Sequence, residues 1–455
     1  MMITDQLNVE RYKEPYLEAV SRLIEIPSVT SSPLLQKPFG EAIDQCLNKA
    51  LGICETLGFK VFKDPEGYYG YAEIGGSDPD GELLGILGHL DIVPPGELGA
   101  WTTPPFVPSL RNGRLYGRGA QDDKGPTLAV VFAIKALVDA GYVFRHRVRV
   151  IFGTDEENLW RCMERYSAKE SIPSAGFAPD SGFPLTYAEK TLIQGWLAGP
   201  GSEELSVDIG GTLNAVPGLA CYRGGYRERL IDALNELGFD FACEEDEIQV
   251  YGKAAHAASS DTKGVNAITR LCIALKKVGV DHPAVEFIAE QVGEDANAQQ
   301  LFGPLHDESG RLTCNIGALI INEEESKVGI DLRVPVSVDK EQIDGDLKEV
   351  CGEYGLTYSE YSCKPSLFVP VVSDLVGCLM GAYQSITGDK DAAPIASGGA
   401  TYARAFPNCV AFGAILPGRE KVEHMSDEFL IIEDMMLAIQ IYAEALVRMD
   451  GIDKF

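Results

Sequence analysis

The stretch "LLGILGHLDIV", residues 83–93, is an almost unbroken apolar run that ends on a histidine and an aspartate. Such a run predicts a strand buried on both faces, as in the parallel sheets of α/β proteins. Residues 126–140 then predict a helix that ends at Gly141, and "RVRVIFG" (147–153) predicts a second buried strand. Strands and helices in alternation predict an α/β fold with a central, mostly parallel sheet flanked by helices.

The N-terminal region adds elements of the same kind. Apolar residues at helical spacing predict helices over 8–26 and 40–57. The segment "KVFKDPEGYYGYAEIG" (60–75) that follows predicts a β-hairpin.

The sequence changes character near residue 190. Short strands now dominate, with predicted helices at 223–237 and 264–278, which is typical of a separate α+β domain. From about residue 374 the pattern returns to helix, strand and helix. We therefore expect one domain over 1–189 and 375–455, into which an α+β domain, 190–374, is inserted.

Composition excludes several classes of partner. The chain has 455 residues and a formal net charge of −29, which opposes binding to nucleic acid or anionic lipid. No apolar run is long enough to span a bilayer, and the N-terminus has no secretory signal pattern. Eleven scattered cysteines without a Cys-x-x-Cys pair fit reduced thiols. We expect a cytoplasmic protein that binds neither nucleic acid nor membrane.

Polar residues follow the first two buried segments. His89 ends the first strand, and Asp91, two positions on, lies on the same side of an extended chain, where its carboxylate could fix the tautomer of a metal-bound histidine. Asp122 and Asp123 precede the predicted helix. A hydrogen-bonded strand-end histidine and a helix-capping aspartate are the alternatives, although capping explains one aspartate better than two.

The stretch "IFGTDEENLW" (151–160) repeats this arrangement with Asp155, Glu156 and Glu157 after a strand and a turn glycine. Acidic residues in the first turn of a solvated helix are the alternative, and for Asp155 that alternative stays open. Asp180 lies between prolines, where an Asx-turn is the simpler interpretation. His424 in "VEHMSDE" could be an ordinary loop histidine.

The early candidates all fall at strand ends, which is the edge of an open α/β sheet where ligands bind. Two histidines and several carboxylates would form a nitrogen and oxygen site suited to zinc, manganese or cobalt. An excess of carboxylates allows two metals to share one of them. Because Glu156 and Glu157 are adjacent and point differently, one could hold metal while the other acts as a base.

Six motifs in this order resemble a known family: "GHLDIVP", "LYGRGAQDDKGP", "GTDEENLW", "PDSGFP", "YGKAAHA" and "VEHMSDE". They are similar to those of the co-catalytic zinc metallopeptidases that include aminoacylase, carboxypeptidase G and succinyl-diaminopimelate desuccinylase. Within that family the similarity is greatest to bacterial PepV-type dipeptidases. The resemblance implies a catalytic domain with an inserted lid, here residues 190–374.

The resemblance also implies a ligand set for two divalent metal ions, with zinc expected first and manganese or cobalt as alternatives. His89 and Asp180 would hold one metal, and Glu157 and His424 would hold the other. Asp122 would bridge them, followed by a cis peptide bond to Asp123.

The catalytic roles come from the same resemblance. Asp91 matches the residue that orients the first histidine, and Glu156 matches the general base. On the lid, His256 matches a histidine that stabilises the tetrahedral oxyanion, and an exposed loop histidine is the alternative.

Five further residues match positions that contact substrate. Asn214 and Arg333 lie on the lid, and Arg333 could take a terminal carboxylate through a bidentate pair. Ser397, Gly398 and Gly399 match a loop whose backbone N–H groups approach a carboxylate. Simple turns are the alternative for Asn214 and for this loop.

The resulting hypothesis is a monomeric, metal-dependent dipeptidase. A metal-bridging water, activated by the glutamate base, would attack the peptide bond of an unblocked dipeptide. The alternatives are a deacylase or desuccinylase of N-acyl amino acids, and a protein that binds metal or peptide without turnover.

Overall fold

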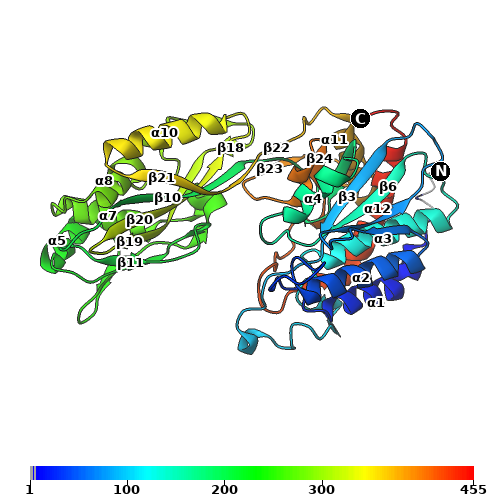
Figure 1. The fold of residues 1–455 in the computed structure, drawn as a ribbon, viewed down its shortest axis with the longest axis horizontal. Coiled ribbons are helices and arrows are strands. Elements are labelled where there is room, and N and C mark those ends of the chain that lie inside the picture. Colours follow the sequence, from blue (N-terminus) through cyan, green and yellow to red (C-terminus); the bar gives the residue numbers. More distant parts are fainter. Residues whose placement is uncertain (1–3, 5–6) are drawn as a thin grey trace. The chain divides into compact units, whose positions relative to one another are not determined.

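The structure, a computed structural model, describes residue 4 and residues 7–455 and divides into two compact units. The first takes in the chain up to Tyr187 with Val369–Ile395 and Thr401–Phe455, and the second takes in Ala188–Phe368 and Ala396–Ala400. In Figure 1 the blue start and red end of the chain belong to one unit, and its green and yellow middle forms the other. The assignment of residues 1–189 and 375–455 as a catalytic domain, and of 190–374 as a lid, stays a proposal.

The first unit is built on a mixed sheet with a parallel centre. In spatial order its strands include β1 (Lys60–Lys63), β2 (Gly70–Ile74), β6 (Arg147–Gly153), β3 (Leu83–His89), β7 (Ala175–Ala178), β24 (Cys409–Ala411) and β9 (Thr186–Glu189). Neighbours from β6 to β24 run parallel, and the pairings toward both edges are antiparallel. Every residue of β3 is buried, which explains its unbroken apolar sequence. The predicted α/β class is confirmed.

Helices cover this sheet. They are α1 (Lys13–Ile24), α2 (Glu41–Thr56), α3 (Lys124–Asp139), α4 (Arg161–Lys169), α11 (Asp374–Thr387) and α12 (Ile432–Asp450), with short turns η2 (Val9–Tyr12), η3 (Leu98–Ala100) and η6 (Tyr402–Ala405). Helix α3 packs on β3, α1 and α12, and Figure 1 shows α1, α2 and α3 side by side. Because α3 carries apolar residues on all faces, it is buried almost completely. Among the described residues, no helix combines the length and the apolar character that crossing a membrane requires.

A small antiparallel sheet joins two segments that are far apart in the sequence. Its strands are β4 (Ser109–Arg111), β5 (Arg114–Tyr116) and β26 (Phe429–Ile431), and β8 (Ser181–Gly182) pairs with β25 (Ala414–Ile415) elsewhere in the unit. The pairing of β5 with β26 sets Tyr116 opposite Phe429. The segment before α3 therefore starts beside the segment that carries His424.

The second unit is a five-stranded antiparallel sheet with helices. The strand order is β11 (Val207–Ile209), β19 (Thr313–Ile321), β20 (Glu325–Val334), β10 (Thr191–Pro200) and β21 (Thr357–Lys364). The helices are α5 (Arg227–Leu237), α6 (Ser260–Lys263), α7 (Ala267–Lys277), α8 (Pro283–Phe287), α9 (Gln299–Phe302) and α10 (Lys340–Glu353), with a short 3₁₀ helix η4 (Ala257–Ser259) and a short π-helix η5 (Ile288–Val292). The predicted α+β character of this part of the chain is confirmed.

Short strands complete the second unit and the segments that lead to it. They are β12 (Ala215–Val216), β13 (Leu219–Tyr222), β14 (Phe241–Cys243), β15 (Ile248–Tyr251), β16 (Ala255–His256), β17 (His306–Asp307), β18 (Gly310–Arg311), β22 (Leu367–Phe368) and β23 (Ile395–Ser397). One apolar core joins the sheet to its helices, with Leu197, Ile330 and Leu275 completely buried in it.

Candidate metal centre

His89 ends strand β3 and is completely buried. Its Nδ1 makes a 2.9 Å hydrogen bond with the main-chain oxygen of Asp91, whereas Oδ1 of the Asp91 carboxylate is 3.7 Å away. That carboxylate instead accepts a hydrogen bond from the Glu157 N–H at 3.0 Å. The ring is therefore oriented by a main-chain oxygen of Asp91, which differs from the predicted carboxylate contact, and its Nε2 faces Asp122.

Asp122 lies between two histidines. Its Oδ1 is 2.8 Å from Nε2 of His89, and its Oδ2 is 3.1 Å from Nε2 of His424. The peptide bond from Asp122 to Asp123 is cis, as predicted. A carboxylate that turns one oxygen toward each histidine has the arrangement that a shared ligand requires.

Two further carboxylates complete two clusters around Asp122. Oδ2 of Asp180 is 3.7 Å from Nε2 of His89, and Oε1 of Glu157 is 3.1 Å from Nε2 of His424. In each cluster the candidate ligand atoms lie within 4.8 Å of one another. The structure thus brings together all five residues predicted to hold metal, and Asp122 belongs to both clusters.

These charged groups shift one another's pKa values. Burial, and next the charge of Asp122, raise the pKa of Asp180 well above its ordinary value. Burial alone would lower the pKa of His89, but the closeness of Asp122 and the charges of Asp180 and Asp91 outweigh it and hold that pKa well above its ordinary value. Asp122 and Glu157 raise the pKa of His424 to about 11. The cluster therefore concentrates negative charge, which favours a cation.

The donor atoms fit a pair of divalent cations. Two imidazole nitrogens and three carboxylates, with no thiolate, suit zinc, manganese or cobalt. Nε2 of His89 is buried and makes no hydrogen bond of acceptable geometry with the described residues, although Asp122 Oδ1 is near. A buried ring nitrogen that faces carboxylate oxygens without a hydrogen bond is placed as a ligand atom would be.

The three acidic residues of "TDEEN" have three environments. Glu157 belongs to a ligand cluster, whereas Glu156 is 8% exposed, belongs to neither cluster, and contributes to the raised pKa of Asp180. Asp155 is completely buried, and both of its oxygens accept hydrogen bonds from the Arg161 guanidinium at 2.7 Å. It also accepts one from the Arg161 main-chain N–H, at the start of α4. The solvated helix start left open for Asp155 is therefore wrong.

In the second unit, His256 lies on a two-stranded ribbon. The pairing of β12 with β16 sets it opposite Ala215, next to the exposed Asn214. Nδ1 of His256 accepts a hydrogen bond from the Ala258 N–H at 3.1 Å. Desolvation and the charge of Arg333 lower the pKa of His256, so its ring is neutral at pH 7. Its proton then sits on Nε2, which makes that nitrogen a hydrogen-bond donor.

Arg333 is buried and already engaged. Its Nε and Nη2 donate to the two oxygens of Asp331 at 2.6 and 3.0 Å, and its Nη1 donates to Gly398 O at 2.9 Å. Asp331 therefore occupies the fork formed by Nε and Nη2, which is the side-on fork of the guanidinium. After these contacts, each terminal nitrogen has one further N–H. A substrate carboxylate cannot use that fork while Asp331 holds it, and the predicted bidentate contact through the remaining terminal N–H groups stays a prediction.

The predicted substrate loop lies against the same part of the second unit. A Cβ at Gly398 would come within 2.8 Å of the Ala258 side chain, so the close approach requires glycine. The Gly399 N–H donates to Ser397 Oγ at 2.9 Å, and Ser397 O accepts from the Lys190 N–H. The loop is therefore ordered by bonds within its own unit.

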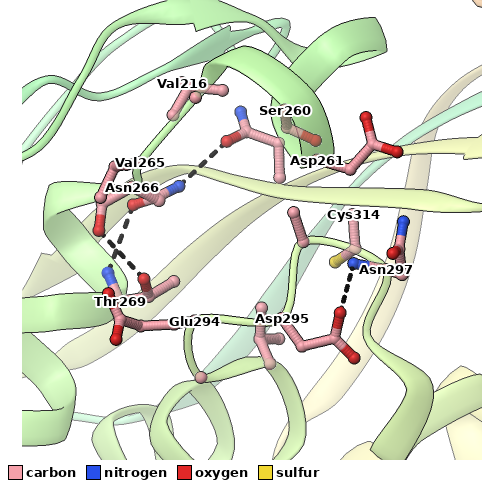
Figure 2. Close-up of a pocket in the computed structure, with 15 residues that line it drawn as sticks. Val216, Ser260, Asp261, Val265, Asn266, Thr269, Glu294, Asp295, Asn297 and Cys314 are labelled. Carbon is pink, nitrogen blue, oxygen red and sulfur yellow. Dashed lines mark hydrogen bonds between the residues drawn. The ribbon is translucent and has the colours of Figure 1, made fainter.

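The second unit contains a cavity of about 200 Å³ that none of the predicted site residues lines. Figure 2 shows the residues that line it. Two asparagines of its wall bond to each other, Asn266 Nδ2 donating to Asn315 Oδ1 at 2.9 Å. Asn315 Nδ2 also donates to the main-chain oxygens of Leu213 and Ala215 at 2.8 Å each. These bonds hold the chain on both sides of Asn214.

Two residues near the metal cluster were missed from the sequence. Glu428 is completely buried and accepts hydrogen bonds from the main-chain N–H groups of Gln121 and Asp122. The Gln121 side chain in turn accepts a hydrogen bond from the segment before His424. Glu428 stands in the same acidic motif as His424, which was the available signal. Its partners lie about 300 positions away, so spacing alone could not identify them.

The chain is similar to known proteins over most of its length. A model of "Peptidase family M20/M25/M40" matches residues 85–448. A Bacillus subtilis protein named "Putative dipeptidase YtjP" is 34% identical, with 98% of this chain and 99% of that protein covered. Two solved structures share the fold. The M20 family metallo-carboxypeptidase Sso-CP2 of Sulfolobus solfataricus has a TM-score of 0.61 and 20% identity, with 96% of this chain and 99% of that chain covered. Human carnosine dipeptidase 1 has a TM-score of 0.62 and 15% identity, with 99% and 100% covered.

Proposed function

This chain belongs to peptidase family M20/M25/M40, and on that premise we propose that it is a metal-dependent dipeptidase acting on unblocked dipeptides. The observation that carries the proposal is the pair of ligand clusters that share Asp122, with the buried Glu156 outside both. A protein that only binds metal or peptide gains nothing from such a carboxylate. The choice of dipeptides is supported by the name of the Bacillus subtilis relative.

We assign His89 and Asp180 to one metal ion, Glu157 and His424 to the other, and Asp122 to both. Zinc is our first choice, because it favours imidazole and carboxylate ligands, and manganese or cobalt would suit the same donors. When bound, such ions polarise the scissile carbonyl and lower the pKa of water.

In the proposed mechanism Glu156 moves the proton. It takes a proton from the attacking water as the oxygen of that water bonds to the carbonyl carbon. When the C–N bond breaks, Glu156 passes this proton to the leaving amine nitrogen, and so returns to its starting state. The burial of Glu156 limits competing proton exchange with bulk water.

The second unit supplies the proposed substrate contacts. The neutral His256 can donate its Nε2 proton in a hydrogen bond to the carbonyl oxygen as negative charge develops there. The remaining N–H groups of Arg333, with Asn214 and the loop 397–399, are our candidates for holding the dipeptide. Because one chain carries all these residues, we propose that the monomer is the active form.

We expect the purified protein to hydrolyse dipeptides such as alanyl-alanine, and a chelator to abolish this activity until zinc, manganese or cobalt is restored. Against N-acetylalanine we expect kcat/KM to be lower by about tenfold or more, because a site built for a free amino terminus leaves polar groups unpaired with an acylated one. Release of amino acid, followed chromatographically together with metal content, measures both effects. Faster turnover of the acylated substrate would favour a deacylase instead.

We expect Asp155→Asn to weaken both the fold near α4 and the turnover. The asparagine accepts with one oxygen only, so part of the Arg161 guanidinium loses its partner at a cost of about 1–3 kcal/mol. Because Asp155 directly precedes Glu156, kcat should fall while KM changes little. Denaturant unfolding and steady-state kinetics measure these effects.

The surface aspartate Asp139 provides a matched control for this variant. It also pairs with an arginine, Arg11, at 3.1 Å, but lies at the end of α3. Asp139→Asn should lower stability slightly and leave kcat unchanged. If Asp155→Asn keeps the wild-type kcat, the turn does not position Glu156.

A further inference from the structure

Gln121 ties the segment that carries Asp122 to the segment that carries His424. Its Oε1 accepts hydrogen bonds from the Val422 and Glu423 N–H groups at 2.7 and 3.1 Å. Its Nε2 donates to Glu420 O at 3.2 Å. A single half-buried side chain thus bonds the main chain at three places just before His424.

Glu428 makes the reciprocal connection. This completely buried carboxylate follows His424 and accepts from the main-chain N–H groups of Gly119, Gln121 and Asp122 at 3.0, 2.8 and 3.2 Å. Arg118 Nη1 donates a fourth bond at 2.7 Å. Each segment therefore reaches across with one side chain and binds the main chain of the other.

The segment around His424 needs such support. His424 has a φ of +64°, a left-handed conformation that a residue with a side chain rarely adopts unless its surroundings impose it. Its side chain is 53% exposed, so packing does little to fix the ring. Two contacts hold the ends of this segment. The Arg419 side chain donates to the Asp434 carboxylate, and the Thr102 N–H donates to the Asp427 carboxylate. Gln121 bonds the main chain between these two points.

We propose that Gln121 and Glu428 are positioning residues that fix the distance between Asp122 and His424, and thereby set the affinity for metal. The inference rests on the proposed metal pair. Gln121 acts on the His424 segment, so it governs the ion that Glu157 and His424 would hold. Glu428 acts on Asp122, which belongs to both clusters, so it governs both ions.

The chemistry of each side chain matches its task. An amide offers an acceptor and a donor together, and Gln121 uses both. A glutamate at position 121 would keep the two accepted bonds and lose the donated one, whereas a methionine of similar length would lose all three. Glu428 only accepts, and a glutamine in its place would turn an N–H₂ group toward main-chain donors.

The test is titration of the metal-free protein with Zn²⁺ by calorimetry. For Gln121→Met we expect the affinity for one of two equivalents to fall by about 10–100-fold, the usual cost of removing a group that orients a ligand, while the other is unchanged. Gln121→Glu should lie closer to wild type. For Glu428→Gln the affinity for both Zn²⁺ equivalents should fall.

Matched variants separate positioning from general stability. Gln384 also donates to a main-chain oxygen, that of Ala392 at 3.0 Å, and Glu444 is a completely buried carboxylate bound to Arg448. Gln384→Met and Glu444→Gln should lower the melting temperature of the metal-free protein as much as their counterparts and leave Zn²⁺ binding unchanged.

The inference would be overturned if Gln121→Met and Glu428→Gln bound both Zn²⁺ equivalents with wild-type affinity. It would also be overturned if the matched variants lost as much Zn²⁺ affinity as these two. Fewer than two equivalents in the wild-type protein would instead overturn the proposed metal pair. The two failures are therefore distinguishable.

Discussion

We expect the replacement of Glu156 with alanine to remove nearly all dipeptide hydrolysis and to leave two metal ions bound per chain. Glu156 belongs to neither ligand cluster, so its loss takes away no metal ligand. The variant lacks the proposed base, which would accept the proton of water and return it to the amine, and a positioned acid–base group contributes about 10²–10⁴-fold to a rate. Metal analysis and steady-state kinetics on the same preparation measure both effects.

Glu157 is the natural control, because it is the adjacent residue of the same type. Its Oε1 lies 3.1 Å from His424 Nε2, inside a cluster, so Glu157→Ala should lose metal as well as activity. Unchanged activity in Glu156→Ala would rule out the proposed base. Loss of metal in Glu156→Ala, with metal kept in Glu157→Ala, would mean that the two roles are exchanged.

The convergence of the candidate ligands was predictable because it depends on strand ends. In the parallel pairing of β3 with β6, His89 lies opposite Gly153, so the chain enters "TDEEN" beside the histidine. Continuous apolar runs located both strands in the sequence, and the glycine and acidic residues after them located their ends. Residues that follow neighbouring parallel strands must meet, whatever the details of their hydrogen bonds.

Those details were not predictable. Whether His89 bonds the carboxylate or the main-chain oxygen of Asp91 depends on sub-ångström placement, and Glu157 N–H decides it by taking the carboxylate. The roles of Gln121 and Glu428 depend on the pairing of β5 with β26, two three-residue strands that no periodicity reveals.

The ion pair of Asp331 with Arg333 was predictable from the sequence. Asp331 and Arg333 are two positions apart in β20, and alternate residues of a strand lie on the same face. Opposite charges at that spacing predict the observed ion pair, and with it the loss of the side-on fork for a substrate carboxylate. The burial of Asp155 gave no such signal, since its partner Arg161 lies beyond a turn whose shape depends on a positive φ at Trp160.

Replacing Asp122 with asparagine should abolish hydrolysis and lower the affinity of the protein for both metal ions. The amide has no charge and only one ligating oxygen, so it cannot turn a carboxylate oxygen toward both His89 and His424. We expect each affinity to fall by more than about 100-fold, beyond the cost of losing a group that only supports a ligand. Loss of the ions would also remove several kcal/mol of transition-state stabilisation. This corresponds to a fall in rate on the order of 10³-fold or more.

Asp123 makes this prediction selective, because it carries the same group one position later. It is completely buried, and burial raises its pKa to about 7. Its Oδ2 accepts from Thr127 Oγ1 at 2.6 Å and from the His89 N–H at 3.2 Å, and Oδ1 makes no hydrogen bond with the described residues. An asparagine can place its oxygen at the position of Oδ2 and its N–H₂ group at the position of Oδ1. In the Zn²⁺ titration, Asp123→Asn should therefore still bind two ions, whereas Asp122→Asn should not. Equal binding by the two variants would show that Asp122 is not the shared ligand.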